Sequence, residues 1–351
     1  MPLLCIYTHG YAGACGLLAH PFRFGGKTSP TFGCQLLQGR CIRPGEALEL
    51  IRGETAMAHV TEGYMPFLGY QTYYRITGEA NPDKAPLLLL HGGPGSTHNY
   101  FEVFDQLAEA DRRQVIMYDQ LGCGNSFVEG HPELWNQDIW LDELEQLRDH
   151  LDLGQVHILG QSWGGMLQIA YACDRHPEGV RSYIISSGNP SSHMWEAEGL
   201  RRIALMGESQ RDAIYHAMET GDFEDSDYLA AVDEYMRRYC DSESRPDLPE
   251  CVTRDKRFGD EAYLYGWGPN EFCPTGTLKD FEYADRLGEI HIPCLICSGI
   301  QDLCSPLIAK TMHDGIKGSQ WNLYPHSHHM CFIDDENTYM KDAIRWLNQH
   351  D

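Results

Sequence analysis

Residues 156–165 read VHILGQSWGG, and this stretch decides the fold. Its first four residues are mostly apolar, as in a buried strand, and the apolar spacing of residues 166–170 predicts a helix directly after the turn. Glycines on both sides of Ser162 relieve crowding around a strained residue, so the turn can present the serine hydroxyl as a nucleophile. A tight turn with a structural serine is the alternative, but the strand-turn-helix context favours catalysis.

Strands and helices alternate along the chain outward from this turn. Further strands are predicted at residues 60–67, 71–76, 87–90, 114–118, 183–185, 294–298 and 321–324, the first two as an antiparallel hairpin. Helical spacing of apolar residues indicates a helix at 140–151 and a closing helix at 339–347. The alternation predicts an α/β fold, with a mostly parallel sheet and helices on both faces.

The region 189–287 breaks this alternation, because its sequence is helical in pattern and highly charged. About a hundred residues between two strands of one sheet far exceeds ordinary connection lengths, which indicates a functional element. We therefore expect a core formed by residues 57–188 and 288–351, with residues 189–287 forming a helical cap over the active site.

Residues 1–56 differ from the rest of the chain, since they are rich in glycine and cysteine and show no sustained hydrophobic period. The change of pattern at Met57 predicts that the natural protein starts there and that residues 1–56 are a poorly specified extension. The first twenty residues are largely apolar, but no basic residue precedes them and His9 interrupts the run. We therefore expect no signal peptide.

The charge balance and the cysteine content narrow the class of partner and the compartment. The chain carries 51 acidic and 27 basic residues, a net charge of −24, which would repel nucleic acid and anionic membrane surfaces. No apolar run is long enough to span a membrane. The 13 cysteines are odd in number and follow no disulfide framework, so we expect a cytoplasmic protein in which Cys294 and Cys297 are buried structural residues.

The motif HGGPG at residues 91–95 directly follows the predicted strand 87–90. A glycine-rich loop in that position lets the backbone approach a substrate closely and supplies an oxyanion donor. We assign the oxyanion hole to the backbone N–H groups of Gly93 and Trp163. A phosphate-binding loop is the alternative, but the lysine and hydroxyl residue that such loops carry do not follow here.

An acid and a base should follow the serine in the chain. Asp302 lies just beyond a predicted strand, where it could orient an imidazole, although an Asx turn is the alternative. Three histidines, His326, His328 and His329, are candidates for the base, and spacing alone does not choose among them. With Cys331 they could also form a zinc site, but such close spacing rarely gives four tetrahedral ligands, so no metal is expected. The remaining histidines are predicted to lie on the surface.

Five motifs together resemble one family over residues 57–351. They are HGGPG at 91–95, YDQLGCGNS at 118–126, GQSWGG at 160–165, GPNEF at 268–272 and the histidine segment near the carboxyl end. The chain resembles the proline iminopeptidases (prolyl aminopeptidases), including the tricorn-interacting aminopeptidases. The resemblance implies the α/β-hydrolase fold and a catalytic triad of Ser162, Asp302 and His329. His329 is preferred to His328 because an apolar stretch and then acidic residues follow it, as in the family.

The resemblance also implies how the substrate is recognised. Glu271, within GPNEF, occupies the position of a cap carboxylate that pairs with the free α-amine of the substrate; an exposed surface carboxylate is the alternative. Some relatives carry a second acid after the catalytic aspartate, but Leu303 stands there in this chain. Trp163 and Trp267 are expected to form apolar walls for a proline ring.

The expected function is that of a serine aminopeptidase that releases an N-terminal residue, preferentially proline, through an acyl-enzyme intermediate. The expected partners are small peptides with a free N-terminus, and no cofactor is required. An amino-acid amidase or esterase of the same fold is the main alternative. A non-catalytic binding protein would have little need for an intact Ser, Asp and His set.

Overall fold

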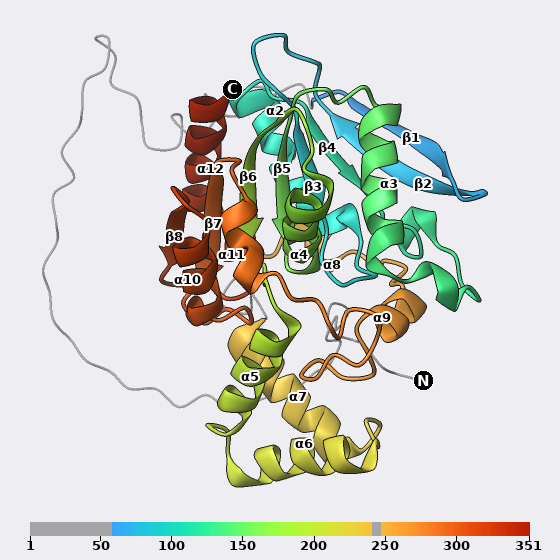
Figure 1. Cartoon of the computed structure of the whole chain (residues 1–351), viewed down its shortest axis with the longest axis vertical. Coiled ribbons are helices and arrows are strands. Elements are labelled where there is room, and N and C mark those ends of the chain that lie inside the picture. The colour runs from blue at the N-terminus through green and yellow to red at the C-terminus, as the bar shows by residue number, and fades with distance from the viewer. Residues whose placement is uncertain (1–57, 241–246) are drawn as a thin grey trace, which may run out of the picture. The chain divides into compact units, whose positions relative to one another are not determined.

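The computed structural model describes residues 58–240 and 247–351, so the predicted extension 1–56 lies outside the described part. Eight strands form one sheet in the order β1-β2-β4-β3-β5-β6-β7-β8 (Figure 1). Their bounds are β1 Val60–Phe67, β2 Tyr70–Thr77, β3 Leu87–Leu90, β4 Val115–Tyr118, β5 Val156–Gln161, β6 Val180–Ser186, β7 Cys294–Gly299 and β8 Gln320–Tyr324. Every strand predicted from the sequence is present.

The sheet is parallel except at its first edge. β1 and β2 form an antiparallel hairpin, and β2 pairs antiparallel with β4. The strands from β4 through β3, β5, β6 and β7 to β8 all pair in parallel. The carboxyl ends of the parallel strands therefore meet at one edge of the sheet, where side chains from distant parts of the chain can converge.

Helices cover both faces of the sheet, and alternate residues of each strand contact different layers. Leu88 and Leu90 of β3 pack in one apolar cluster with α3 (Gln137–His150), α4 (Trp163–Ala170) and α10 (Pro306–Gly315). Leu87 and Leu89 pack on the opposite face with η1 (His98–Asp105), α2 (Gln106–Ala110), α11 (Cys331–Asp334) and α12 (Glu336–His350). The remaining short segments are η2 Gly124–Ser126, η3 Pro132–Leu134 and η4 Tyr171–Arg175. The predicted layered architecture is confirmed.

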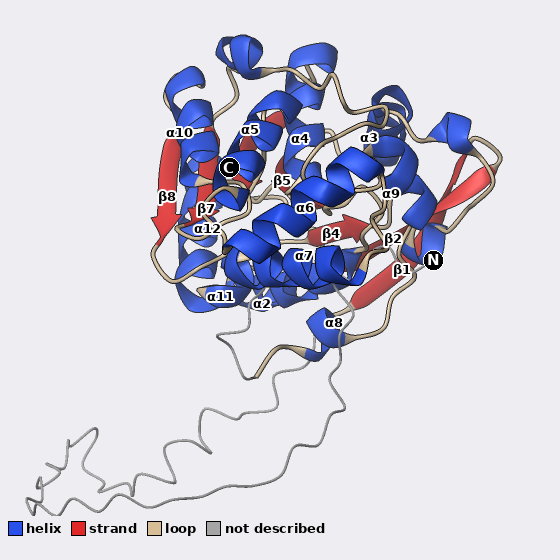
Figure 2. Ribbon diagram, turned by 90° about the horizontal axis from the view of Figure 1, so that it is seen from below, coloured by secondary structure: helices blue, strands red, loops and turns tan. Residues whose placement is uncertain are grey.

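The long connection between β6 and β7 is helical, and its described residues contribute no strand to the sheet. It contains α5 Ser192–Ile203, α6 Glu208–Thr220, α7 Ser226–Tyr239, α8 Glu250–Thr253, α9 Asp260–Gly266 and η5 Ala284–Glu289. Helices α5, α6 and α7 lie together below the sheet in Figure 1, and α6 and α7 cross in front of it in Figure 2. The side chains of Ser191 and Asp225 cap α5 and α7 by accepting backbone N–H groups of their first turns.

Two direct contacts join this insertion to the loops at the carboxyl ends of the strands. Arg202 of α5 donates to the carbonyl of Leu303, which follows β7, at 3.0 Å. The backbone N–H of Gly259 donates to the carbonyl of Gly95, which follows β3, at 2.8 Å. The insertion is thus anchored to two of the loops that carry predicted site residues, the loop of Gly93 and the loop of Asp302.

Cys294 and Cys297 are free thiols in the described structure. Cys294 and Cys297 are buried on β7, where they belong to the apolar clusters on opposite faces of the sheet. Their prediction as structural residues is confirmed, because side chains three positions apart on a strand point in opposite directions. In the described part of the chain, no helix combines the length and the apolar character needed to cross a bilayer.

Candidate active site

Ser162 occupies a sharp turn between β5 and α4. Its backbone has φ 55° and ψ −119°, a conformation that is strained for a residue with a side chain. Glycine is required at the flanking positions because the backbone segments lie very close together. A Cβ atom on Gly160 would lie 2.2 Å from the carbonyl oxygen of Gly164. A Cβ atom on Gly164 would lie 1.9 Å from the carbonyl oxygen of Leu90. The turn therefore holds Ser162 at the carboxyl edge of the sheet, at the first residue before a helix.

Asp302 and His329 meet at the same edge, and both are almost completely buried. Nδ1 of His329 lies 2.8 Å from Oδ1 of Asp302. The carboxylate also accepts the Cys304 backbone N–H at 2.9 Å, the Ser187 hydroxyl at 2.6 Å and the Gly299 backbone N–H at 3.2 Å. These bonds fix the orientation of the carboxylate. With Nδ1 donating to Asp302, Nε2 is the nitrogen that can accept a proton.

The other two candidate histidines are held elsewhere. Nδ1 of His328 lies 3.2 Å from Oδ2 of Asp334, and its Nε2 lies 3.1 Å from Oε1 of Gln301. His326 is exposed. Among these three histidines, only His329 has a hydrogen bond to Asp302 in the described structure.

The zinc alternative is not matched by the geometry. In the part of the chain that the structure describes, His326, His328, His329 and Cys331 do not gather as a group of possible ligands. The one such group found there combines His329 with Asp302 and Cys304. Burial raises the pKa of the Cys304 thiol well above its usual value, which favours the protonated form over the thiolate that metals bind.

The glycine-rich loop after β3 passes directly beside Ser162. A Cβ atom on Gly92 would lie 3.1 Å from the Cβ of Ser162, and Gly93 has φ 117°, which favours glycine. Trp163 is the first residue of α4, where the N–H groups have no partner within the helix. Within the described residues, neither the Gly93 nor the Trp163 backbone N–H donates to a protein acceptor.

Glu271 lies in the insertion and is only partly exposed. Burial raises the pKa of its carboxyl to about 7, although the Tyr263 hydrogen bond and the nearby charge of His329 favour ionisation. The Tyr263 hydroxyl donates to Oε2 at 2.5 Å. The indole N–H groups of Trp195 and Trp267 both point at the Glu271 carbonyl oxygen, at 2.7 and 3.3 Å. These contacts distinguish Glu271 from a fully exposed carboxylate with no partner.

Leu303 and Trp163 have structural contacts that the sequence did not suggest. The Leu303 side chain is 6% exposed, and its carbonyl accepts from Arg202. The Trp163 indole is buried against Trp140, with ring centroids 4.9 Å apart, and donates to Oε1 of Gln120 at 2.8 Å. The Trp163 side chain is thus part of the core, because its polar edge and its ring are both occupied there.

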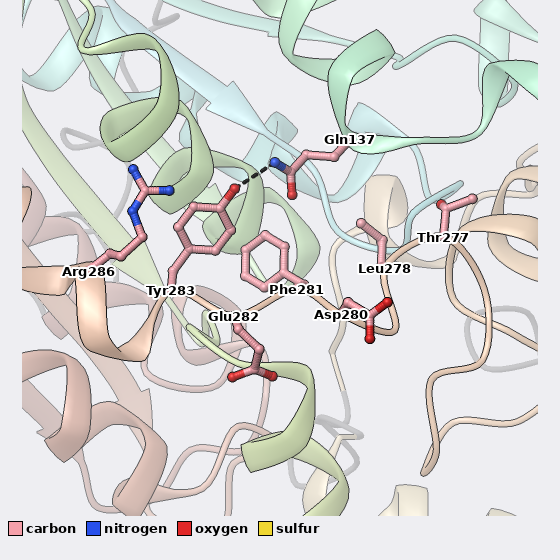
Figure 3. Close-up of a pocket in the computed structure, with 8 residues that line it drawn as sticks. All are labelled: Gln137, Thr277, Leu278, Asp280, Phe281, Glu282, Tyr283 and Arg286. Carbon is pink, nitrogen blue, oxygen red and sulfur yellow. Dashed lines mark hydrogen bonds between the residues drawn. The ribbon is translucent and has the colours of Figure 1, made fainter.

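A separate pocket of about 230 Å³ lies near the start of α3 and the end of the insertion. It is lined by Gln137, Thr277, Leu278, Asp280, Phe281, Glu282, Tyr283 and Arg286, as Figure 3 shows. The Gln137 side chain donates to the Tyr283 hydroxyl at 2.6 Å across one side. None of the predicted site residues lines this pocket, so we do not assign it to the reaction.

Several residues at the site were missed from the sequence. Ser187 supports Asp302, and Trp195 and Tyr263 support Glu271. Nothing local marks Ser187 and Trp195, because their partners are 115 and 76 positions away in the chain, and the contact of Tyr263 with Glu271, eight positions away, crosses from a helix to a loop. The prediction that the remaining histidines lie on the surface is wrong for three of them, namely His91, His98 and His157, which are buried.

The fold and the site now define a class of protein. A family model described as "alpha/beta hydrolase fold" matches residues 85–336. The chain therefore belongs to the α/β hydrolases.

Comparison with known proteins narrows that class. The chain is 56% identical to a proline iminopeptidase of Clostridioides difficile (strain 630), over 83% of this chain and 99% of the relative. It is 51% identical to a proline iminopeptidase of Lactobacillus helveticus (strain DPC 4571), with the same coverage. The crystal structure of a Mycobacterium smegmatis proline iminopeptidase matches with a TM-score of 0.74 and 29% identity, over 83% of this chain and 98% of that chain. Within the α/β hydrolases, the chain belongs to the proline iminopeptidase family.

Proposed function

We propose that this protein is a serine exopeptidase that removes an N-terminal proline from small peptides. Ser162 attacks the carbonyl carbon of the first residue while His329 Nε2 takes the hydroxyl proton. Asp302 holds the imidazole in the tautomer that can accept this proton. His329 then protonates the leaving amine, and a water molecule deprotonated by the same histidine releases the amino acid from the acyl-enzyme.

The negative charge of the tetrahedral intermediate is stabilised by the Gly93 and Trp163 backbone N–H groups. Two observations support this assignment: the glycine-rich loop lies beside Ser162, and Trp163 lies at the start of α4. A helix N-terminus also favours negative charge through its dipole.

Recognition of the free N-terminus rests on Glu271, and the observation that carries the exopeptidase proposal is this partly buried carboxylate of the insertion, which the Tyr263 hydroxyl holds in place. A carboxylate held in this way can pair with the free amine of a substrate, and relatives of the chain at 56% identity are proline iminopeptidases. Trp267, buried beside Glu271, supplies an apolar wall for the proline ring. With Leu303 in place of a second acid, one carboxylate carries the recognition of the amine.

The insertion acts as a cap that carries this recognition site, with residues 189–287 inserted between core segments 57–188 and 288–351. Free thiols such as those of Cys294 and Cys297 suit a reducing compartment, and we place the protein in the cytoplasm.

The nucleophile is tested by replacing Ser162 with alanine. Ser162→Ala should lower kcat for a proline anilide by at least about a thousandfold, because the covalent step is lost. A fluorophosphonate probe should label the wild-type protein and fail to label the variant. The matched control is Ser226→Ala, at an exposed position of α7. Peptidase activity retained in Ser162→Ala would remove this serine from the mechanism.

Amine recognition is tested by Glu271→Gln. We expect kcat/KM for the proline anilide to fall about tenfold to a hundredfold, since hydrogen bonds to charged groups contribute about 1.5–3 kcal/mol. Hydrolysis of a simple acyl ester, which has no amine, should change little. Glu219→Gln, which removes an exposed charge from α6, is the control. An equal loss on both substrates would contradict the recognition role and favour an esterase or amidase.

A further inference from the structure

Both proposed oxyanion donors are backbone N–H groups, so no side-chain substitution removes them directly. Their separation depends on how two chain segments are held together: the loop after β3, which carries Gly93, and the start of α4, which carries Trp163. A displacement of about 1 Å in such a site can lower the rate by about a hundredfold. A side chain that fixes both segments would therefore control catalysis without touching the substrate.

Gln120 bonds to both segments. Its Nε2 donates to the carbonyl oxygen of His91 at 3.1 Å, two residues before Gly93. Its Oε1 accepts the indole N–H of Trp163 at 2.8 Å. Gln120 is 1% exposed, so water does not compete readily for either bond. One planar amide thus sets the distance between the glycine loop and the turn that carries the nucleophile.

A second contact ties Gln120 to the same loop through its backbone. The Gln120 N–H donates to Nε2 of His91 at 2.9 Å. Because Nε2 accepts, the His91 proton resides on Nδ1, which donates to the carbonyl of Gly92 at 2.8 Å. Burial lowers the pKa of His91 to about 4, so the ring stays neutral near pH 7 and keeps this tautomer.

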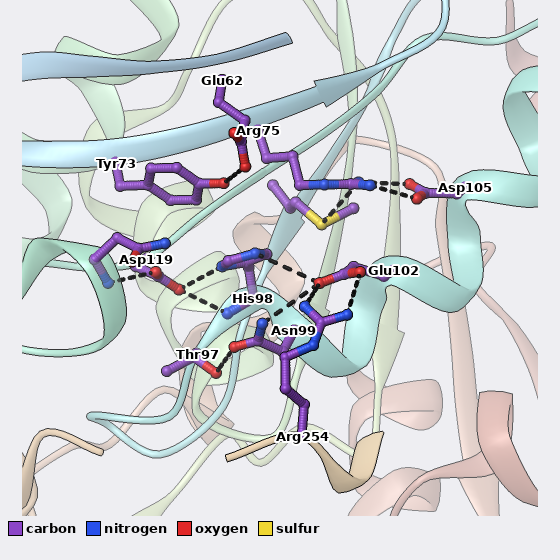
Figure 4. A network of polar contacts seen from close by, with 12 residues as sticks. Glu62, Tyr73, Arg75, Thr97, His98, Asn99, Glu102, Asp105, Asp119 and Arg254 are labelled. Carbon is purple, nitrogen blue, oxygen red and sulfur yellow. Dashed lines mark hydrogen bonds and ion pairs between the residues drawn. The ribbon is translucent and has the colours of Figure 1, made fainter. Parts of the chain in front are cut away.

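The chain segment that carries Gln120 is itself held firmly, as Figure 4 shows for its neighbour Asp119. Oδ1 of Asp119 accepts both the backbone N–H of His98 at 2.8 Å and its Nδ1–H at 2.7 Å. Oδ2 accepts the backbone N–H of Asn125 at 2.8 Å. A Cβ atom on Gly124 would lie 2.2 Å from this oxygen, so the loop closes around the carboxylate. Gln120 is therefore presented from a fixed support.

We propose that Gln120 is a positioning residue of the oxyanion hole, which sets the spacing of the Gly93 and Trp163 N–H groups through His91 and the Trp163 indole. The proposal rests on the proposed function, because it needs a tetrahedral intermediate at Ser162. It deepens that function by naming the side chain on which the spacing depends.

The direct test is Gln120→Met, which keeps the length of the side chain and removes both amide hydrogen bonds. We expect kcat for a proline anilide to fall about tenfold to a hundredfold, less than the loss of a whole oxyanion donor. KM should stay within about twofold, because these contacts affect the stabilisation of charge in the transition state and not the binding of the substrate. Labelling by a fluorophosphonate should slow by a similar factor, since its phosphoryl oxygen uses the same donors.

Gln168→Met is the matched control. Gln168 is also 1% exposed and lies on α4, but its amide donates only to the carbonyl of Ile158, at 3.3 Å. We expect kcat and labelling rate near those of the wild type. If Gln168→Met lost as much kcat as Gln120→Met, or if Gln120→Met raised KM alone, the positioning role would be overturned.

Trp163→Phe is a second, independent test of the same contact, and it can be used even if Gln120→Met fails to fold. It removes the indole N–H and keeps both the ring against Trp140 and the backbone N–H. We expect it to lower kcat, and the double variant with Gln120→Met to lose less than the product of the two single losses. Wild-type kcat in Trp163→Phe would refute the proposal. Absence of fluorophosphonate labelling in the wild type would instead refute the proposed function.

Discussion

At the residue scale, the protonation of Glu271 is set by opposing effects. Burial disfavours the carboxylate, whereas the Tyr263 hydroxyl and the positive form of His329 favour it. Burial is the larger effect, and the pKa rises from its ordinary value of 4.5 to about 7. A bound ammonium group would lower it again, because an opposite charge nearby favours the ionised form.

The first prediction follows from this shift. Below about pH 7, Glu271 in the free enzyme gains a proton and can no longer pair with an ammonium group, so kcat/KM for a proline anilide should fall as the pH drops through about 7. The corresponding limb in kcat should lie at lower pH, because bound substrate stabilises the carboxylate. Steady-state kinetics across this range check both limbs. The same kcat/KM profile in Glu271→Gln would show that another group causes the limb.

At the element scale, α3 is joined to the sheet by a buried acid. Glu143 accepts the Thr72 hydroxyl from β2 at 2.5 Å and the Leu121 backbone N–H from the loop after β4 at 2.9 Å. Glu143 is fully buried, and burial raises the pKa of its carboxyl from 4.5 to about 8. The helix, the hairpin and the loop that carries Gln120 therefore share one protonated group near pH 7.

This group makes stability depend on pH in a defined direction. Between about pH 4.5 and 8 the folded state holds a proton that the unfolded chain has lost, so the contribution of Glu143 to the free energy of unfolding falls as pH rises. Glu143→Gln should remove this slope and be more stable, relative to the wild type, at pH 9, about one unit above the window, than at pH 5, close to its lower end. Urea unfolding at both values measures the difference. Glu145→Gln, on the same helix, should keep the wild-type slope.

At the scale of the whole molecule, charge repulsion opposes folding. The chain carries 51 acidic and 27 basic residues, which gives the net charge of −24. Like charges repel across the surface of the compact state, and this repulsion is screened by salt over a distance that shortens from about 30 Å at 0.01 M to about 10 Å at 0.1 M.

We therefore expect Tm to rise when sodium chloride is increased from about 0.01 M to about 0.1 M, concentrations that span this change in screening. Differential scanning calorimetry measures the shift. Chloride is preferred to sulfate, because sulfate also strengthens apolar burial. A constant or falling Tm would mean that stabilising ion pairs, which salt also screens, outweigh the repulsion.

The strands and the serine turn were predictable because their signals are local. Short apolar or mostly apolar runs identify strands such as β3 and β5, and the glycines around Ser162 indicate a close approach that only glycine permits. Asp302 was predictable from its place after β7. The position of the Trp163 side chain was not predictable, because its ring contacts and its indole hydrogen bond involve α3 and the loop after β4.

The sequence by itself determined the α/β architecture, the helical insertion and the turn that holds Ser162, since periodicity and glycine spacing act over a few residues. Only the tertiary structure showed that His329 bonds to Asp302 and that burial raises the pKa of Glu271. Gln120 contacts His91 across 29 positions and Trp163 across 43. Burial and hydrogen bonds between such distant positions exist only after the chain has folded, so no local pattern encodes them.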